Sequence, residues 1–202
     1  MSAFLGPIHF WLYNKIQLQQ ELVEEVLNLT NDLLPDLKEG LDTRYGKYEK
    51  KPLEEVIDQG NIHGWLQSSI SQIEYMLAYG ITEIIKADPS MLSKIDTIFQ
   101  IKGEEKTTLI SGSNAADAYK AIGDCLLDGM PCDHANCVLE ENEEKVIWKR
   151  NACVHAKFWE EVCGDIHIYY SLREAFIKGY LKETQLVYEK VDEVTNIIRR
   201  TT

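Results

Sequence analysis

Apolar residues spaced by three and four positions run through the segment from Ile62 to Ala87, and this spacing constrains the fold more than any other feature of the chain. Side chains at these intervals lie on one face of an α-helix, so the segment predicts a long helix with one buried face. The residues expected on that face are Leu66, Ile70, Ile73, Leu77 and Ile84. The first half of the chain is therefore expected to be helical.

A second stripe of the same kind occupies residues 16–34, and Pro35 is expected to end it because proline cannot continue a helix. Residues 40–52 are polar and contain glycine, which predicts a loop. Residues 88–89, an aspartate followed by a proline, are typical of a helix start, and Gly103 lies where that helix is expected to stop.

The second half of the chain is richer in strand patterns. Val138–Leu139 and Val146–Trp148 flank the polar sequence EENEEK, which is typical of a β-hairpin. Residues 166–170 alternate between apolar and polar positions and predict a strand, and a capping box after them predicts a helix to about Leu181. Residues 184–200 combine helical spacing with many β-branched residues, so strand and helix both stay open there.

Together these patterns predict an α+β fold, with an N-terminal helical region followed by a small antiparallel sheet with helices. Residues 1–112 form the expected helical region, and residues 113–202 form an α+β region that carries the hairpin. A chain of 202 residues also suits a single compact domain, so both organisations stay open.

The chain carries a formal net charge of −12. The electrostatic field of such a negative charge repels phosphate backbones and anionic membranes, so we expect neither nucleic acid nor a membrane as partner. No segment has the roughly 18 apolar residues of a membrane helix, and the first residues lack the pattern of a signal peptide. Five cysteines, an odd number, fit reduced thiols better than a disulfide framework. We therefore expect a cytoplasmic protein with a small-molecule ligand, whose amphipathic helices allow a homodimer.

Two Cys-x-His pairs lie at the two ends of the hairpin segment, Cys132 with His134 and Cys153 with His155. If the hairpin folds symmetrically about its polar turn, Cys132 comes opposite Cys153 and His134 comes opposite Asn151. Facing Cβ atoms of antiparallel strands lie about 4.5–5.5 Å apart. This register predicts that the two pairs converge on one site.

Two kinds of chemistry suit such a site, and the first is metal binding. Thiolates and imidazoles bind Zn²⁺ tetrahedrally, so a zinc site would use Cys132, His134, Cys153 and His155. With Cys137 or Cys163 added, the same region can hold an iron–sulfur cluster. The cysteine spacings match no common zinc motif, so the cofactor stays unknown.

The second chemistry is nucleophilic catalysis by a thiol. Cys153 precedes a helix expected from about residue 155 to residue 163, and the positive end of a helix favours a thiolate. His134 or His155 is then the candidate base, and Asp133 or Asp165 is the candidate that orients it.

A third interpretation assigns the cysteines to the core, because free cysteines are often buried as small apolar residues. Cys125 fits this interpretation on a predicted helix, and Cys137 fits it because the symmetric register places it opposite Trp148. The same register pairs Glu140 with Lys145, and this pair of opposite charges supports the symmetric register. His9 lies in the apolar sequence HFWLY and is expected to be a core histidine rather than a ligand.

The stretch KVIWKRNACVHAKFWEEVCG resembles proteins of the L-2-amino-thiazoline-4-carboxylic acid hydrolase-like family. The resemblance covers roughly residues 120–200 and rests on a strand with Val and Trp, a cysteine before a helix, and a glycine after that helix. It implies a bacterial cytoplasmic protein that uses an essential cysteine to open a small sulfur–nitrogen ring by hydrolysis. Cys153 holds the position of that cysteine.

The cysteine pattern favours a thiol-dependent enzyme, and the resemblance implies that it hydrolyses a small molecule containing sulfur and nitrogen. The alternatives are a metal-binding protein with zinc or an iron–sulfur cluster, and a non-catalytic ligand-sensing or interaction module.

Overall fold

The computed structural model of the chain describes residues 4–201. These residues form two compact units, one of residues 4–91 with 155–166 and one of residues 92–154 with 167–201. Helices precede a small antiparallel sheet along the chain, so the predicted α+β class is confirmed. No helix in the described part of the chain is long and apolar enough to cross a membrane.

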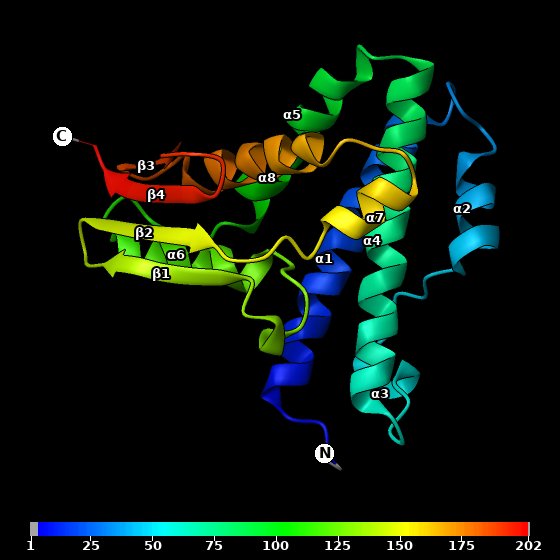
Figure 1. Cartoon of the computed structure of the whole chain (residues 1–202), viewed down its shortest axis with the longest axis horizontal. Coiled ribbons are helices and arrows are strands. Elements are labelled where there is room, and N and C mark those ends of the chain that lie inside the picture. The colour runs from blue at the N-terminus through cyan, green and yellow to red at the C-terminus, as the bar shows by residue number, and fades with distance from the viewer. Residues whose placement is uncertain (1–3, 202) are drawn as a thin grey trace. The chain divides into compact units, whose positions relative to one another are not determined.

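The first unit is helical and consists of α1 (Pro7–Thr30), α2 (Leu37–Tyr45), α3 (Leu53–Val56), α4 (Ile62–Ala87) and α7 (Ala156–Glu161). The helix predicted over 62–87 is confirmed at both ends. Helices α1 and α4 lie side by side and run in the same direction (Figure 1). Contacts along them show this, since His9 meets His63 near their starts and Gln19 bonds Glu74 further on.

Helix α1 begins nine residues before the predicted position, at Pro7 instead of residue 16. The His9 side chain explains the early start, because its Nδ1 accepts a hydrogen bond of 2.9 Å from the Gly6 backbone N–H. His9 is buried, so its predicted role as a satisfied core histidine is confirmed. The helix ends at Thr30, before Pro35, and the loop predicted for 40–52 is wrong up to residue 45, because those residues belong to α2.

The second unit contains most of α5 (Met91–Lys106) and α8 (Ile166–Leu181), and these helices meet at two glycines. A Cβ atom on Gly103 would lie 2.1 Å from the Phe176 carbonyl oxygen. A Cβ atom on Gly179 would lie 2.0 Å from the Gln100 carbonyl oxygen. The predicted helix stop at Gly103 is therefore wrong, since that glycine permits close contact between two helix backbones.

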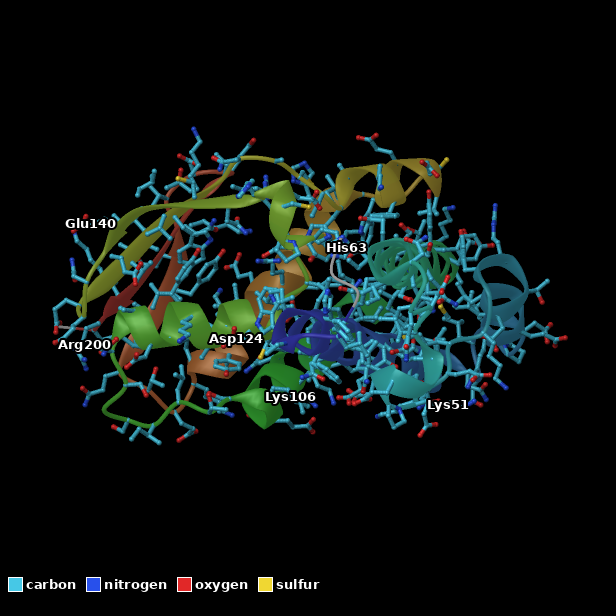
Figure 2. The ribbon with its side chains drawn as sticks, turned by 90° about the horizontal axis from the view of Figure 1, so that it is seen from below. Lys51, His63, Lys106, Asp124, Glu140 and Arg200 are labelled. Atoms are coloured by element: carbon cyan, nitrogen blue, oxygen red, sulfur yellow. The ribbon has the colours of Figure 1, made fainter. Side chains whose placement is uncertain are left out.

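The sheet of the second unit contains β1 (Asn136–Glu141), β2 (Lys145–Arg150), β3 (Leu186–Lys190) and β4 (Thr195–Arg200). The strands are antiparallel in the order β1-β2-β4-β3. Helix α6 (Ala115–Cys125) packs against β2 and β4, and the Tyr119 ring contacts the Trp148 ring at a centroid distance of 5.1 Å. Seen from below, α6 and α8 lie on the same side of the sheet, as Figure 2 shows with Asp124 labelled on α6 and Glu140 on β1.

The strand predicted over residues 166–170 is wrong, because these residues form the start of α8. Tyr169, Leu172 and Phe176 are buried at helical spacing, so packing of the helix overrides the short β-like alternation. The open question over residues 184–200 is answered by β3 and β4, which form a second hairpin.

Candidate functional site

The first hairpin forms where the sequence predicted it, but with a different register. The Lys145 ammonium lies 3.0 Å from the Glu140 carboxylate, but in the backbone ladder Glu140 faces Ile147, so the predicted strand pair of Glu140 with Lys145 is wrong. The ladder starts from the turn with Glu141 opposite Val146, so the turn is centred one residue later than predicted. A bulge between Val138 and Glu140 then shifts the pairing by one residue, and Val138, not Cys137, faces Trp148. Cys137 faces Lys149 and is exposed, which makes its predicted core position wrong.

The hairpin also ends earlier than the symmetric register requires. Strand β1 begins at Asn136, and residues Pro131–Asp133 form a 3-10 turn in place of a strand. His134 has a φ of 47°, which turns the chain away from the extended conformation. The Asn151 side chain still donates a hydrogen bond of 3.4 Å to the His134 carbonyl, so these two residues are neighbours as predicted.

Because the ladder stops at Asn136, the predicted pairing of Cys132 with Cys153 across two strands is wrong. Cys132 is exposed, whereas Cys153 is half-buried. Asp133 accepts a hydrogen bond of 2.8 Å from the Met130 backbone N–H, and this bond closes the 3-10 turn. The direct hydrogen-bond partner of Asp133 is therefore local backbone.

Cys153 has a partner that the sequence did not indicate. The hydroxyl of Tyr170, near the start of α8, donates a hydrogen bond of 3.1 Å to the Cys153 sulfur. The Arg150 guanidinium at the end of β2 lies 3.8 Å from the centroid of the Tyr170 ring. The end of one strand and the start of one helix thus bring a thiol, a phenol and a cation together within the second unit.

Burial, and next the hydrogen bond to Cys153, raise the pKa of Tyr170 above its ordinary value near 10. Tyr170 therefore keeps its proton at neutral pH and remains a hydrogen-bond donor. The Arg150 cation favours the ionised phenol, but its effect is smaller than that of burial.

A small cavity of about 30 Å³ lies beside Tyr170. Its lining is polar and aromatic and comes from Asp128, Asn136, Trp148, Arg150, Tyr170, Arg173, Ile177, Tyr188, Lys190, Glu193 and Asn196. Arg173 is held by Asp128 through two hydrogen bonds of 2.7 and 2.8 Å. Burial disfavours the Arg173 charge, but the Asp128 carboxylate outweighs this and raises the Arg173 pKa. The Arg150 guanidinium donates a hydrogen bond of 3.2 Å to the backbone carbonyl of Glu193, an uncharged acceptor.

His155 belongs to the first unit and has partners there. It is the residue before α7, and its side chain is 2% exposed. Its Nδ1 lies 3.1 Å from Glu74 Oε2, and Glu74 Oε1 accepts a hydrogen bond of 3.0 Å from the Gln19 amide. Gln19, Glu74 and His155 form a buried polar chain that joins α1, α4 and the start of α7.

The remaining cysteine candidates are Cys163, in the first unit, and Cys125, in the second. Helix α7 ends at Glu161, two residues before the predicted end, and Cys163 is exposed with a φ of 56°. Cys125 is half-buried, near the Tyr180 hydroxyl of α8. Between residues 4 and 201, no group of three or more cysteine, histidine, aspartate or glutamate side chains is arranged to hold a metal ion.

Tyr170 and Arg150 are the residues that sequence reasoning missed at this site. Tyr170 fell in the segment predicted as a strand, where its partner was not evident. A helical interpretation of residues 166–181 would have placed it near the start of a helix, but nothing in the sequence shows that this end faces Cys153.

Comparisons with known proteins add no relative: no family model, no curated protein and no solved structure matches the chain. A function must therefore be inferred from the residues of the site and their geometry.

Proposed function

We propose that this protein hydrolyses a small molecule containing sulfur and nitrogen, with the Cys153 thiol as the nucleophile. The hydrogen bond between the Tyr170 hydroxyl and the Cys153 sulfur carries the proposal, because it joins a nucleophile to a group that can transfer a proton. The resemblance of the stretch around Cys153 to the aminothiazoline carboxylic acid hydrolase-like family supports the same reaction class.

The reaction proceeds in two halves. In the first, the Cys153 sulfur bonds to the electrophilic ring carbon, a ring bond of that carbon breaks, and the departing sulfur or nitrogen takes up the thiol proton. Tyr170 relays this proton, giving its own to the departing atom and receiving that of the thiol. In the second half, water adds to the same carbon, the bond to Cys153 breaks, and the thiol regains a proton.

Arg150 supplies the charge that a carboxylate-bearing substrate needs. Its guanidinium lies over the Tyr170 ring and lines the small cavity beside it. Arg173 is already paired with Asp128, so Arg150 is the arginine of this cavity that is better placed to receive a substrate carboxylate. A cavity of about 30 Å³ holds little more than a water molecule, so the substrate is small or displaces side chains at the rim.

The two histidines predicted as bases are alternatives to Tyr170 for the proton transfer. His155 is bonded to the buried Glu74, which suits a structural role. His134 and Asp133 lie in the turn before β1, and their predicted roles as base and orienting group stay predictions. Five cysteines without a disulfide suit a reducing compartment, so we place the protein in the cytoplasm, with a small molecule and not nucleic acid or a membrane as its partner.

Turnover of 2-amino-thiazoline-4-carboxylate, followed by mass spectrometry, tests the proposal. The expected product has gained one water molecule, and Cys153→Ala abolishes its formation. Tyr170→Phe lowers the rate by about 10²–10⁴-fold if Tyr170 carries the proton. The matched control is Cys137→Ser, since Cys137 is an exposed cysteine of the same unit and should leave the rate unchanged.

Equal rates for the wild type and Cys153→Ala would refute the assignment of the nucleophile, and no turnover by the wild type would refute the substrate class. If His134→Ala lowered the turnover rate strongly and Tyr170→Phe left it unchanged, His134 and not Tyr170 would be the residue that transfers the proton.

A further inference from the structure

The first unit contains a pocket of about 560 Å³ that has no part in the proposed chemistry. This volume lies within the range of pockets that hold small organic ligands. Its lining comes from α1, from the segment 45–56 and from the first half of α4. All of these elements belong to the first unit, whereas Cys153 belongs to the second.

Aromatic rings make up much of the pocket wall. Tyr13, Tyr45, Tyr48 and Trp65 all line it. The Tyr13 and Trp65 rings lie 5.9 Å apart and are tilted by 50°, so they present two non-parallel faces. Tyr45 is held from outside the pocket by stacking on Tyr75 at 5.2 Å. Rings fixed in this way offer flat, polarisable surfaces to a planar guest.

Hydrogen bonds hold the segment that closes the pocket. The Tyr13 hydroxyl donates to the Lys51 carbonyl at 2.7 Å, and the Gln72 amide donates to the Gly46 carbonyl at 2.7 Å. These bonds attach both ends of the loop 46–51 to α1 and α4. Gly46 has a φ of 87°, which lets the chain turn sharply from α2 into this loop.

The charges of the pocket are unevenly paired. The Lys51 ammonium lies 2.6 Å from the Glu49 carboxylate, so these two largely neutralise each other. Lys47 lines the pocket and forms no ion pair or hydrogen bond with another described residue, and its charge lowers the Glu49 pKa less than Lys51 does. Glu55 contributes the opposing exposed carboxylate. The unpaired cation therefore lies on the loop and the unpaired anion lies on α3.

We infer that this pocket binds a planar aromatic molecule with one acidic group, whose rings pack against Trp65 and the tyrosines and whose acid meets Lys47. Tyr48 contributes a ring, because its hydroxyl is buried away from solvent. Burial, and next the Tyr13 hydroxyl, raise the Tyr48 pKa, so no tyrosinate competes with the ligand acid at neutral pH. Glu55 limits the affinity for anions and would favour a cation if Lys47 were absent.

Three naphthalene probes of equal ring size separate the contributions of ring and charge. These are 2-naphthoate, which is an anion, 2-naphthamide, which is neutral, and 2-naphthylmethylammonium, which is a cation. Isothermal titration of the full chain should give saturable binding of all three, with naphthoate tightest. Lys47→Met should weaken naphthoate about two- to fivefold and leave naphthamide unchanged, and Glu55→Gln should strengthen naphthoate by a similar factor.

A blocking variant shows that binding occurs in this pocket. Ser68 is an exposed residue of α4 that lines the pocket, so Ser68→Phe fills space there without touching the core. Its matched control is Gln67→Phe, because Gln67 is exposed on the same helix outside the lining. Ser68→Phe should reduce naphthoate affinity at least tenfold and Gln67→Phe should not change it. Equal affinity in both variants, preference for the cation, or no saturable binding of any probe would overturn the inference.

Discussion

Substitution of Gly179 by alanine tests how tightly α5 and α8 are packed. The added Cβ would lie 2.0 Å from the Gln100 carbonyl oxygen and 2.8 Å from its carbonyl carbon, whereas real Cβ contacts are essentially never below 3.0 Å. Both contacts are with backbone, which cannot rotate away as a side chain can. The two helices must therefore separate by at least about 1 Å, a gap that forfeits roughly a quarter to a half of the dispersion attraction at each contact.

Overpacking of this kind costs about 1–3 kcal/mol, and a backbone overlap belongs at the upper end of that range. Alanine gains about 1 kcal/mol over glycine as a helix former, which offsets part of the cost. The net destabilisation expected for Gly179→Ala is about 2 kcal/mol, or about 4–8 °C in Tm for a chain of this size.

The control for this substitution is Gly123→Ala in α6. Nothing lies within 4 Å of a Cβ atom at Gly123, so only the higher helix propensity of alanine acts there. It should raise the free energy of unfolding by about 0.5–1 kcal/mol. Calorimetric melting of the two variants should therefore move in opposite directions from the wild type. If Gly179→Ala melted at or above the temperature of Gly123→Ala, the close helix contact would be wrong.

Three further predictions concern buried groups and the site. His155→Ala should lower the free energy of unfolding by about 2–4 kcal/mol, because it leaves the buried Glu74 without its imidazole partner; an unchanged urea midpoint would contradict this. Burial raises the pKa of Tyr188 to about 12, above about 10 in the unfolded chain, so its share of stability is complete below pH 10 and is lost as pH rises towards 12. Absorbance of tyrosinate, compared with Tyr188→Phe, should show that late titration. Because the proposed reaction uses the Cys153 thiol as nucleophile, a chelator should not change turnover or cysteine labelling; a chelator-dependent change would restore the metal interpretation.

Sequence reasoning succeeded where one periodic signal was long and uninterrupted. The stripe from Ile62 to Ala87 spans many turns, so its helix could be predicted to both ends. The existence of the first hairpin could also be predicted, because two apolar segments flank a polar sequence, although its turn lies one residue later than predicted. Both predictions depend on residues that are close together in the sequence.

The predictions that failed depend on contacts between distant segments. Gly103 has the appearance of a helix stop unless the backbone of α8 beside it is known. The turn lies one residue later than predicted and the bulge after Val138 shifts the ladder again, and no local preference indicates either. The Tyr170 partner of Cys153 lies 17 residues away, and the Glu74 partner of His155 lies 81 residues away. Only the packing of helices and strands brings these pairs together.

Competitive labelling of the five cysteines with iodoacetate and iodoacetamide tests the reactive Cys153 site most directly. The two reagents alkylate thiols in the same way, but only iodoacetate carries the carboxylate that Arg150 should attract. Peptide mass spectrometry over time gives the ratio of the two rates at each cysteine. We predict that this ratio is highest at Cys153, is low at the exposed Cys137 in a chain of net charge −12, and falls in Arg150→Met and Tyr170→Phe. A ratio at Cys153 equal to that at Cys137, and unchanged by both substitutions, would contradict the proposed site.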